Sequence, residues 1–146
     1  MKVLLTGSTG FLGRHLLPEL VRLGNEVIAV GRDFSRVSNA AEDCDAIVHL
    51  AAQTQVSKAV ENPEETWVGN IQGTWRVLEF ARKHGIKRVI TASTDKAYGR
   101  STAPYFESTP LTPDRPYETS KACADMIART YAATYGMRVA VTSLRV

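Results

Sequence analysis

Three glycines near the start of the chain, Gly7, Gly10 and Gly13, constrain the fold more than any other feature of the sequence. They directly follow a short apolar run, residues 2–6, and open a longer amphipathic segment, residues 10–23. The first glycine permits a tight turn, the second lets another group approach the backbone, and the third lets a helix pack close to a strand. The pattern predicts a strand, a sharp turn and a helix whose N-terminal amides favour an anion such as a pyrophosphate. The same glycines could also serve a tight turn alone.

Short β-branched runs alternate with longer amphipathic segments along the rest of the chain, which is typical of a parallel sheet covered by helices. Pro18 should kink the first helix or loosen its first turns. At 146 residues the chain has the size of one domain. We expect strands at residues 2–6, 26–30, 45–50, 88–92 and 138–144, and helices at 10–23, 63–84 and 117–135.

Tyr117 and Lys121 are four residues apart in a segment expected to be helical, so their side chains project from one face. An ammonium beside the phenol favours the ionised phenol. A tyrosine tuned in this way can take or give the proton of a sugar hydroxyl while hydride moves to or from a nicotinamide. The glycine turn and the Tyr-Lys pair, in this order, therefore indicate a nicotinamide-dependent reaction.

The composition argues against several other classes of function. Apolar residues make up 44% of the chain and charged residues 23%, as in globular domains. The net charge of +3 is dispersed, with no basic run, so we expect no nucleic-acid partner. No signal peptide is recognisable and no apolar stretch approaches the roughly 20 residues of a membrane span, so we expect no membrane partner. Cys44 and Cys123 lack metal-ligand spacing and the three histidines are scattered, which predicts free thiols in a reducing cytoplasm and no metal site.

Five segments together resemble the extended short-chain dehydrogenase/reductase family, the NAD(P)-dependent sugar-nucleotide epimerases and dehydratases. They are TGSTGFLG (6–13), HLAA (49–52), NIQGT (70–74), STDKAYG (93–99) and YETSK (117–121). The resemblance extends over nearly the whole chain. It implies an α/β fold with a Rossmann-like, doubly wound parallel sheet of about five strands and helices on both faces.

This resemblance also implies roles for individual residues. Tyr117 would be the catalytic acid/base, Lys121 would hydrogen-bond the nicotinamide ribose and lower the pKa of the phenol, and Thr94 would bond the substrate hydroxyl. Asn70 would tie a helix to a neighbouring strand beside the cofactor. The other residues implied to bind the cofactor are Gly7, Ser8, Thr9, Gly10, Phe11, Leu12, Gly13, Gly31, Arg32, Asp33, Leu50, Ala51, Ala52, Gln53, Ala92 and Ser93.

Asp95 and Lys96 refine this interpretation. An Asp directly after the catalytic Ser/Thr resembles the 4,6-dehydratases, in which it protonates the leaving hydroxyl at C6, whereas many epimerases carry a small or apolar residue there. An ammonium beside this acid would lower its pKa, so Lys96 is expected to point to the substrate as a further catalytic residue. The alternative is a solvent-facing ion pair on a loop.

The choice of cofactor depends on the end of the strand at 26–30, where an acidic residue binds the ribose of NAD and an arginine accommodates the additional phosphate of NADP. By the resemblance, NAD-binding members of the family have Asp at the position of Gly31. Arg32 and Arg36 follow it in this chain. We therefore expect NADP rather than NAD. Asp33 leaves NAD open, because its carboxylate could still reach the ribose.

The sequence departs from the family pattern in two places. Only 15 residues separate Val30 from Ala46, where the family has a helix and a third strand, so about 20 residues are expected to be absent. The sheet would then read 2-1-4-5-6 in family strand names. The chain also stops at Val146, before the C-terminal region that caps the family's sugar-nucleotide site. It is either a shortened relative or part of a longer enzyme.

We expect a single NAD(P)-binding Rossmann domain, residues 1–146, of a cytoplasmic dehydratase or epimerase that transfers hydride at C4 of a nucleotide sugar, with NADP or NAD as cofactor. One alternative is a non-catalytic dinucleotide-binding module that senses or scaffolds, and another is an interaction domain that binds no cofactor. In this family the helices corresponding to 63–84 and 117–135 often form a four-helix dimer interface. The candidates for that interface are Trp67, Trp75, Met126 and Tyr131.

Overall fold

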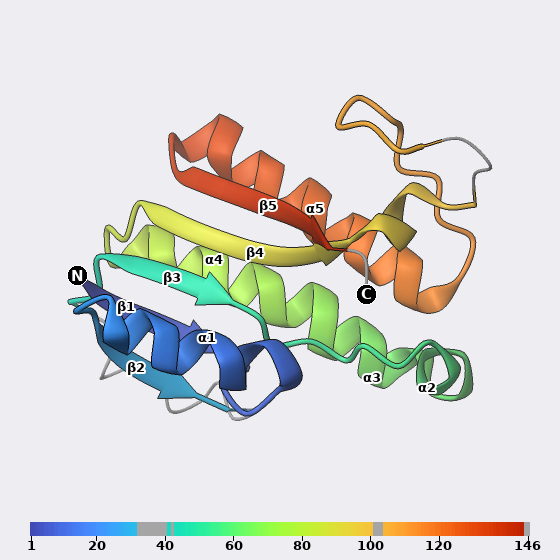
Figure 1. The fold of residues 1–146 in the computed structure, drawn as a ribbon. Coiled ribbons are helices and arrows are strands. Elements are labelled where there is room, and N and C mark those ends of the chain that lie inside the picture. The colour runs from blue at the N-terminus through green and yellow to red at the C-terminus, as the bar shows by residue number, and fades with distance from the viewer. Residues whose placement is uncertain (32–40, 42, 101–103, 145–146) are drawn as a thin grey trace.

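A single parallel sheet forms the centre of the molecule in the computed structural model, which describes residues 1–31, 41, 43–100 and 104–144 (Figure 1). Its five strands have the order β2-β1-β3-β4-β5. Because β2 directly follows β1 in the chain but lies on the other side of β1 from β3, the sheet is wound in both directions. The strands are β1 (Lys2–Thr6), β2 (Glu26–Val30), β3 (Ala46–His49), β4 (Arg88–Thr94) and β5 (Arg138–Leu144).

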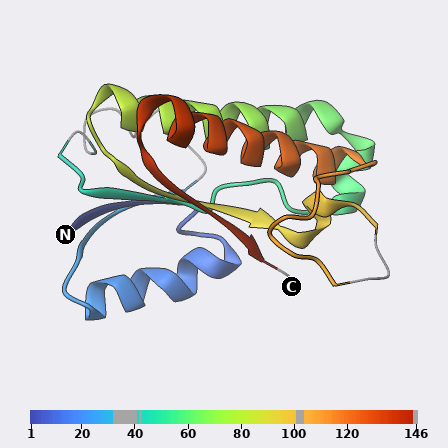
Figure 2. The ribbon, with the colours of Figure 1, turned by 90° about the horizontal axis from the view of Figure 1, so that it is seen from above.

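Helices cover both faces of the sheet, as Figure 2 shows. Helix α1 (Phe11–Arg22) lies on one face. The other face carries α5 (Pro116–Tyr135) and, beside it, the helical segment that ends in α4 (Gly73–Lys83). This arrangement confirms the expected Rossmann-like fold and the strand order 2-1-4-5-6, in which the family's third strand has no counterpart among the described strands.

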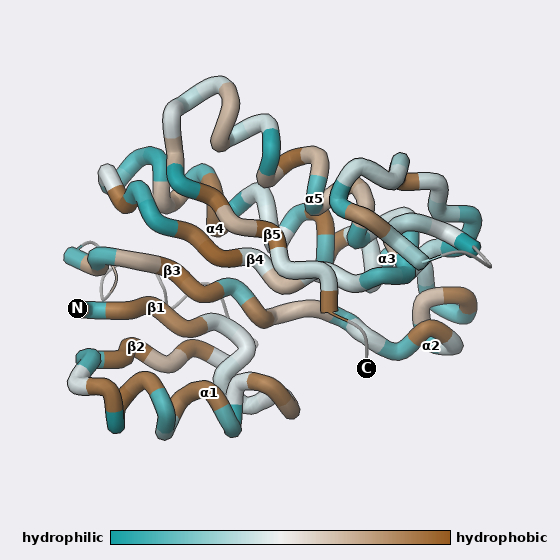
Figure 3. The backbone as a smooth tube through the Cα atoms, turned by 45° about the horizontal axis from the view of Figure 1, so that its top comes forward, coloured by the Kyte–Doolittle hydropathy of each residue, from teal (hydrophilic) through white to brown (hydrophobic). Residues whose placement is uncertain are grey.

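Two apolar clusters fill the spaces between the sheet and its helices. In β1, Leu4 packs into the cluster under α4 and α5, whereas Val3 and Leu5 pack into the cluster under α1. Successive side chains of a strand point to opposite faces, so a strand covered on both sides is apolar on both faces, as the middle of β1 is. Figure 3 shows the hydrophobic residues along the central strands.

The helical segment expected at residues 63–84 is divided in the structure. It consists of α3 (Pro63–Thr66), a π-helix η2 (Trp67–Gln72) and α4. A short helix that was not predicted, α2 (Val56–Glu61), precedes it, and a 3-10 helix η3 (Asp95–Tyr98) follows β4. Helix α1 continues through Pro18. No helix in the described part of the chain is long and apolar enough to cross a membrane.

The carboxyl ends of the parallel strands meet at one edge of the sheet. Thr6 is in register with His49, and β4 continues beyond this level to Thr94, which pairs with Leu144. The loops that follow β1, β3 and β4 therefore leave the sheet on the same side, which is where ligands bind in open α/β sheets.

Candidate active site

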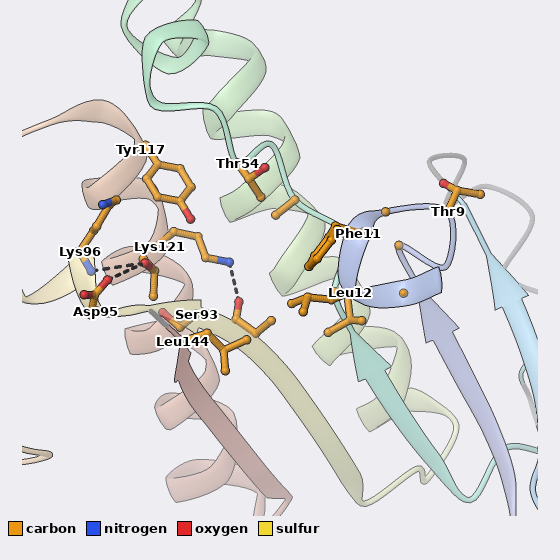
Figure 4. Close-up of a pocket in the computed structure, with 18 of the residues that line it drawn as sticks. Thr9, Phe11, Leu12, Thr54, Ser93, Asp95, Lys96, Tyr117, Lys121 and Leu144 are labelled. Carbon is orange, nitrogen blue, oxygen red and sulfur yellow. Dashed lines mark hydrogen bonds between the residues drawn. The ribbon is translucent and has the colours of Figure 1, made fainter. Parts of the chain in front are cut away.

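A cavity of about 600 Å³ lies at this carboxyl edge. The glycine turn forms one wall, the segment after β3 another, and the end of β4 with the start of α5 a third. Figure 4 shows Tyr117 and Lys121 projecting from α5 on one side, with Phe11 and Leu12 of the glycine turn on the other. Residues more than 100 positions apart in the chain thus line one space.

The glycine turn has the backbone geometry that the sequence predicts. Gly7 has a φ of +71°, which favours glycine, and an added Cβ would lie 2.6 Å from the Ala51 nitrogen. A Cβ on Gly13 would lie 2.2 Å from the Gly7 carbonyl oxygen, so the first turn of α1 packs directly against the loop. The first turn of α1 carries no acidic residue, which leaves its amides suited to an anion.

Tyr117 is buried near the N-terminus of α5, where Pro116 occupies the first turn. Burial raises the pKa of its phenol, the nearby Thr94 hydroxyl lowers it, and the charge of Asp95 raises it. The lowering of this pKa by Lys121 stays a prediction, while the net direction of the Tyr117 pKa in the structure is upward. The physical reason is desolvation, which is the largest contribution.

Lys121 lies one turn further along the same helix face and is only 6% exposed. Its Nζ donates a hydrogen bond of 2.5 Å to the Ala92 carbonyl at the end of β4. Burial lowers the pKa of Lys121 to about 8, while the charge of Asp125 raises it. The ammonium is thus held at the cavity wall, on the side that faces the glycine turn (Figure 4).

His49 is buried at the end of β3, where its ring lies between two threonine hydroxyls. Its Nδ1 is 2.7 Å from the Thr6 hydroxyl and its Nε2 is 3.3 Å from the Thr74 hydroxyl. Burial, followed by the charge of Lys121, lowers the pKa of His49 to about 3. His49 is therefore a neutral packing residue near neutral pH, and the described residues contain no cluster of His, Cys, Asp and Glu that could hold a metal.

Asp95 and Lys96 both line the cavity, where η3 begins. The Thr94 hydroxyl donates to Asp95 Oδ1 at 3.3 Å and accepts from the Lys96 backbone amide at 3.3 Å. Thr94 thus caps η3 and fixes the two residues that follow it. Both side chains lie on the Tyr117 side of the cavity in Figure 4.

Asn70 joins two walls of the site without lining the cavity itself. Its Oδ1 accepts a hydrogen bond from the backbone N–H of Gln53 at 2.8 Å. Its Nδ2 donates to the backbone carbonyl of Gln53 and to the Ser120 hydroxyl, both at 2.9 Å. The segment after β3 is thereby tied to α5, whereas the expected link from a helix to a neighbouring strand beside a cofactor stays a prediction. Gln53 and Ser8, also expected to bind a cofactor, are absent from the cavity lining.

Most of the residues expected at the site come together in the cavity. Arg32 and Asp33, on which the cofactor preference rested, lie outside the described residues. Thr54 and Leu144 line the cavity but were not predicted. Thr54 lies in the segment between β3 and α2, and Leu144 ends β5. The predicted residues found in the lining are Gly7, Thr9, Gly10, Phe11, Leu12, Gly13, Gly31, Leu50, Ala51, Ala52, Ala92, Ser93, Thr94, Asp95, Lys96, Tyr117 and Lys121.

Sequence comparison gives relatives with named activities. The chain is 32% identical to a dTDP-glucose 4,6-dehydratase of Mycobacterium tuberculosis, with 98% of this chain and 52% of the relative covered. It is also 32% identical to a UDP-glucose 4-epimerase of Streptomyces lividans, with 93% and 49% covered. The chain thus spans about half the length of these curated relatives. The first alignment extends over 174 positions, so at least 28 of them (174 − 146) have no counterpart in this chain.

Solved structures with the same fold include enzymes that hold NAD. The dTDP-glucose 4,6-dehydratase of Streptomyces venezuelae, solved with NAD bound, matches with a TM-score of 0.89 and 30% identity, covering 98% of this chain and 55% of that one. The UDP-glucose 4-epimerase of Brucella ovis, in complex with NAD, matches with a TM-score of 0.88 and 26% identity, covering 96% and 50%.

A family model describes nearly the whole chain. The model of the NAD dependent epimerase/dehydratase family matches residues 3–145. This match includes the glycine turn and the Tyr-Lys pair, which line the same cavity. The chain therefore belongs to the NAD-dependent epimerase/dehydratase family.

Proposed function

We propose that this chain is the NAD(P)-binding part of an enzyme that transfers hydride at C4 of a nucleotide sugar. One observation carries the proposal: a phosphate-binding type of turn and a Tyr-Lys-Thr group line the same cavity. The glycine turn suits a pyrophosphate, because the close packing at Gly7 and Gly13 excludes side chains there and because the first turn of α1 carries no acidic residue.

The residues of the chain have distinct roles in this proposal. The amides at the start of α1 bind the pyrophosphate, and Lys121 orients the nicotinamide ribose. A bound nicotinamide supplies the hydride acceptor and donor. Tyr117, assisted by Thr94, takes the proton of the C4 hydroxyl as the C4 hydrogen leaves as hydride, which gives a 4-keto sugar. Asp95 would then protonate the C6 hydroxyl as it leaves as water, while the C5 proton passes to solvent. The hydride taken from C4 would return at C6, so that the dehydration is redox-neutral, an outcome typical of dehydratases.

The proposal predicts that the purified chain binds a nicotinamide dinucleotide by itself. Calorimetric titration with NAD and, in parallel, with NADP should give micromolar dissociation constants, about 8 kcal/mol of binding free energy. A tenfold tighter binding of NADP would support the preference suggested by Arg32, and the reverse would assign NAD. Binding without any turnover of nucleotide sugars would favour the dinucleotide-sensing module. If neither dinucleotide binds, the proposed function is wrong for this chain.

We further propose that two copies of the chain associate through α4 and α5. These helices lie side by side on one face of the sheet (Figure 2), and Trp75 and Met126 expose 40% and 61% of their surface there. The expected result is a dimer in sedimentation velocity that Met126→Arg converts toward monomer, because an arginine cannot be buried unpaired. Phe106→Arg, on an exposed loop residue outside both helices, is the matched control. A monomer at all concentrations would contradict the proposal.

A further inference from the structure

Asp125 is a buried acidic residue that the function proposed above does not use. It lies on α5, four residues after Lys121 and eight after Tyr117, so the three side chains share one face of the helix. Only 3% of Asp125 is exposed. An ionised carboxylate in such a place is costly unless a cation or hydrogen-bond donor lies beside it.

A buried cation, Lys121, lies one helical turn before Asp125 on α5. Burial raises the pKa of Asp125, while the nearby Ser93 hydroxyl, the charge of Lys121 and the charge of Arg129 lower it. Arg129 is exposed, so water screens its charge. Lys121 is buried, and its interaction with Asp125 is therefore screened much less.

The surroundings of Lys121 lead to the same pair. In the part of the chain that the structure describes, its Nζ donates a hydrogen bond to the neutral Ala92 carbonyl. From β3 it faces His49, which carries no charge near neutral pH because burial lowers its pKa to about 3. Tyr117, Asp95 and Lys96 share the cavity with it. Asp125 is the acidic group that raises the pKa of Lys121 against the effect of burial.

We propose that Asp125 is a positioning residue: a buried counterion, one helical turn behind Lys121, that keeps the Lys121 amine charged and directed at the carboxyl end of β4. Without this carboxylate, burial would lower the pKa of Lys121 further and leave a larger neutral fraction near neutral pH. A neutral amine favours neither the ionised Tyr117 phenol nor a fixed contact with a ribose. This consequence for proton transfer rests on the function proposed above, whereas the pairing itself does not.

Titration of Lys121 tests the pairing directly. The ε-carbon resonance of Lys121, assigned by its loss in Lys121→Met, is followed by NMR as a function of pH. We expect a midpoint near 8 in the wild-type chain, in accordance with the pKa in the structure. In Asp125→Asn the midpoint should move to lower pH by roughly one pH unit. Asp125→Glu, which restores the charge, should return most of the shift.

Two controls separate the pairing from a general effect of charge or folding. Asp114→Asn removes an exposed acid and should leave the Lys121 midpoint unchanged. Linkage also requires the reciprocal effect: Lys121→Met should raise the midpoint of the Asp125 carboxyl, which can be measured even if Asp125→Asn does not fold. An unchanged Lys121 midpoint in folded Asp125→Asn, or an unchanged Asp125 midpoint in Lys121→Met, would overturn the proposal.

These titrations need no cofactor or substrate, so they distinguish two kinds of failure. If the Lys121 midpoint shifts as expected but no dinucleotide binds, the pairing holds and the proposed function fails. If dinucleotides bind but the Lys121 midpoint does not respond to Asp125, the function stands and the inference about Asp125 is wrong.

Discussion

Replacing Tyr117 with phenylalanine is expected to lower the rate of hydride transfer by roughly 10²- to 10⁴-fold, the usual contribution of a positioned acid/base group. The substitution removes only the hydroxyl, and the ring stays packed near the N-terminus of α5. Affinity for the dinucleotide should therefore change by less than about twofold, because its pyrophosphate binds at the glycine turn. The rate is measured as reduction of the bound dinucleotide after a nucleotide sugar is added.

The same helix offers a matched control for this variant. Tyr135→Phe makes the same chemical change at the exposed end of α5 and should leave both rate and affinity unchanged. Asp95→Asn separates the two steps of the proposed reaction, since it should preserve hydride transfer but slow the loss of water. If Tyr117→Phe loses dinucleotide binding instead of the chemical step, Tyr117 is a structural residue and the proposed mechanism is wrong.

The strand order of the sheet could be predicted because it follows from the lengths and spacing of the apolar segments in the sequence. Apolar runs of strand length, separated by amphipathic segments, indicate parallel strands, and the short spacing from β2 to β3 leaves too little chain for another helix and strand. The bounds of β1, β2 and β5 agree with the prediction. β4 is longer than predicted because Ser93 and Thr94 still pair with β5.

The division of the helix expected at residues 63–84 could not be predicted, because it is associated with contacts between distant parts of the chain. Asn70 lies within the π-helix η2 and bonds to Gln53 and Ser120, which are 17 and 50 positions away in the sequence. The Thr74 hydroxyl in addition donates to the Asn70 carbonyl. Helical periodicity does not indicate the long-range contacts to Gln53 and Ser120. π-Turns of this kind are frequent at functional sites.

In the candidate site, the spacing of residues predicted which side chains lie together, but not how strongly they are buried. The four-residue interval correctly placed Tyr117 and Lys121 on one helix face, and the turns after the strands gave most of the cavity lining. The effect of burial on the Tyr117 pKa could not be predicted, because desolvation depends on how α5 packs in the fold. The burial of Asp125 was not predicted for the same reason: its spacing places it on the face of Tyr117 and Lys121, but how deeply that face is buried depends on the packing of α5.

Replacing Gly13 with alanine is expected to destabilise the fold by roughly 3 kcal/mol or more and to weaken dinucleotide binding at least tenfold. The new Cβ would lie 2.2 Å from the Gly7 carbonyl oxygen and 2.7 Å from the Ser8 Cα. Both are backbone atoms, so a change of rotamer cannot relieve the contact. The turn must move away from α1, and with it the amides that are proposed to bind the pyrophosphate.

Gly73 supplies the control for this variant, because it lies in a helix where the nearest atom to an added Cβ is 3.9 Å away. Gly73→Ala should therefore keep dinucleotide binding and raise the free energy of unfolding by up to about 1 kcal/mol. Urea unfolding gives the stability of each variant, and calorimetry gives the dinucleotide affinity of the folded protein. Wild-type stability and affinity in Gly13→Ala would show that the close approach of α1 to the loop is not required. Loss of affinity in a chain that still folds would assign the pyrophosphate to this turn, because the substitution lies in that wall of the cavity and leaves Tyr117 and Lys121 in place.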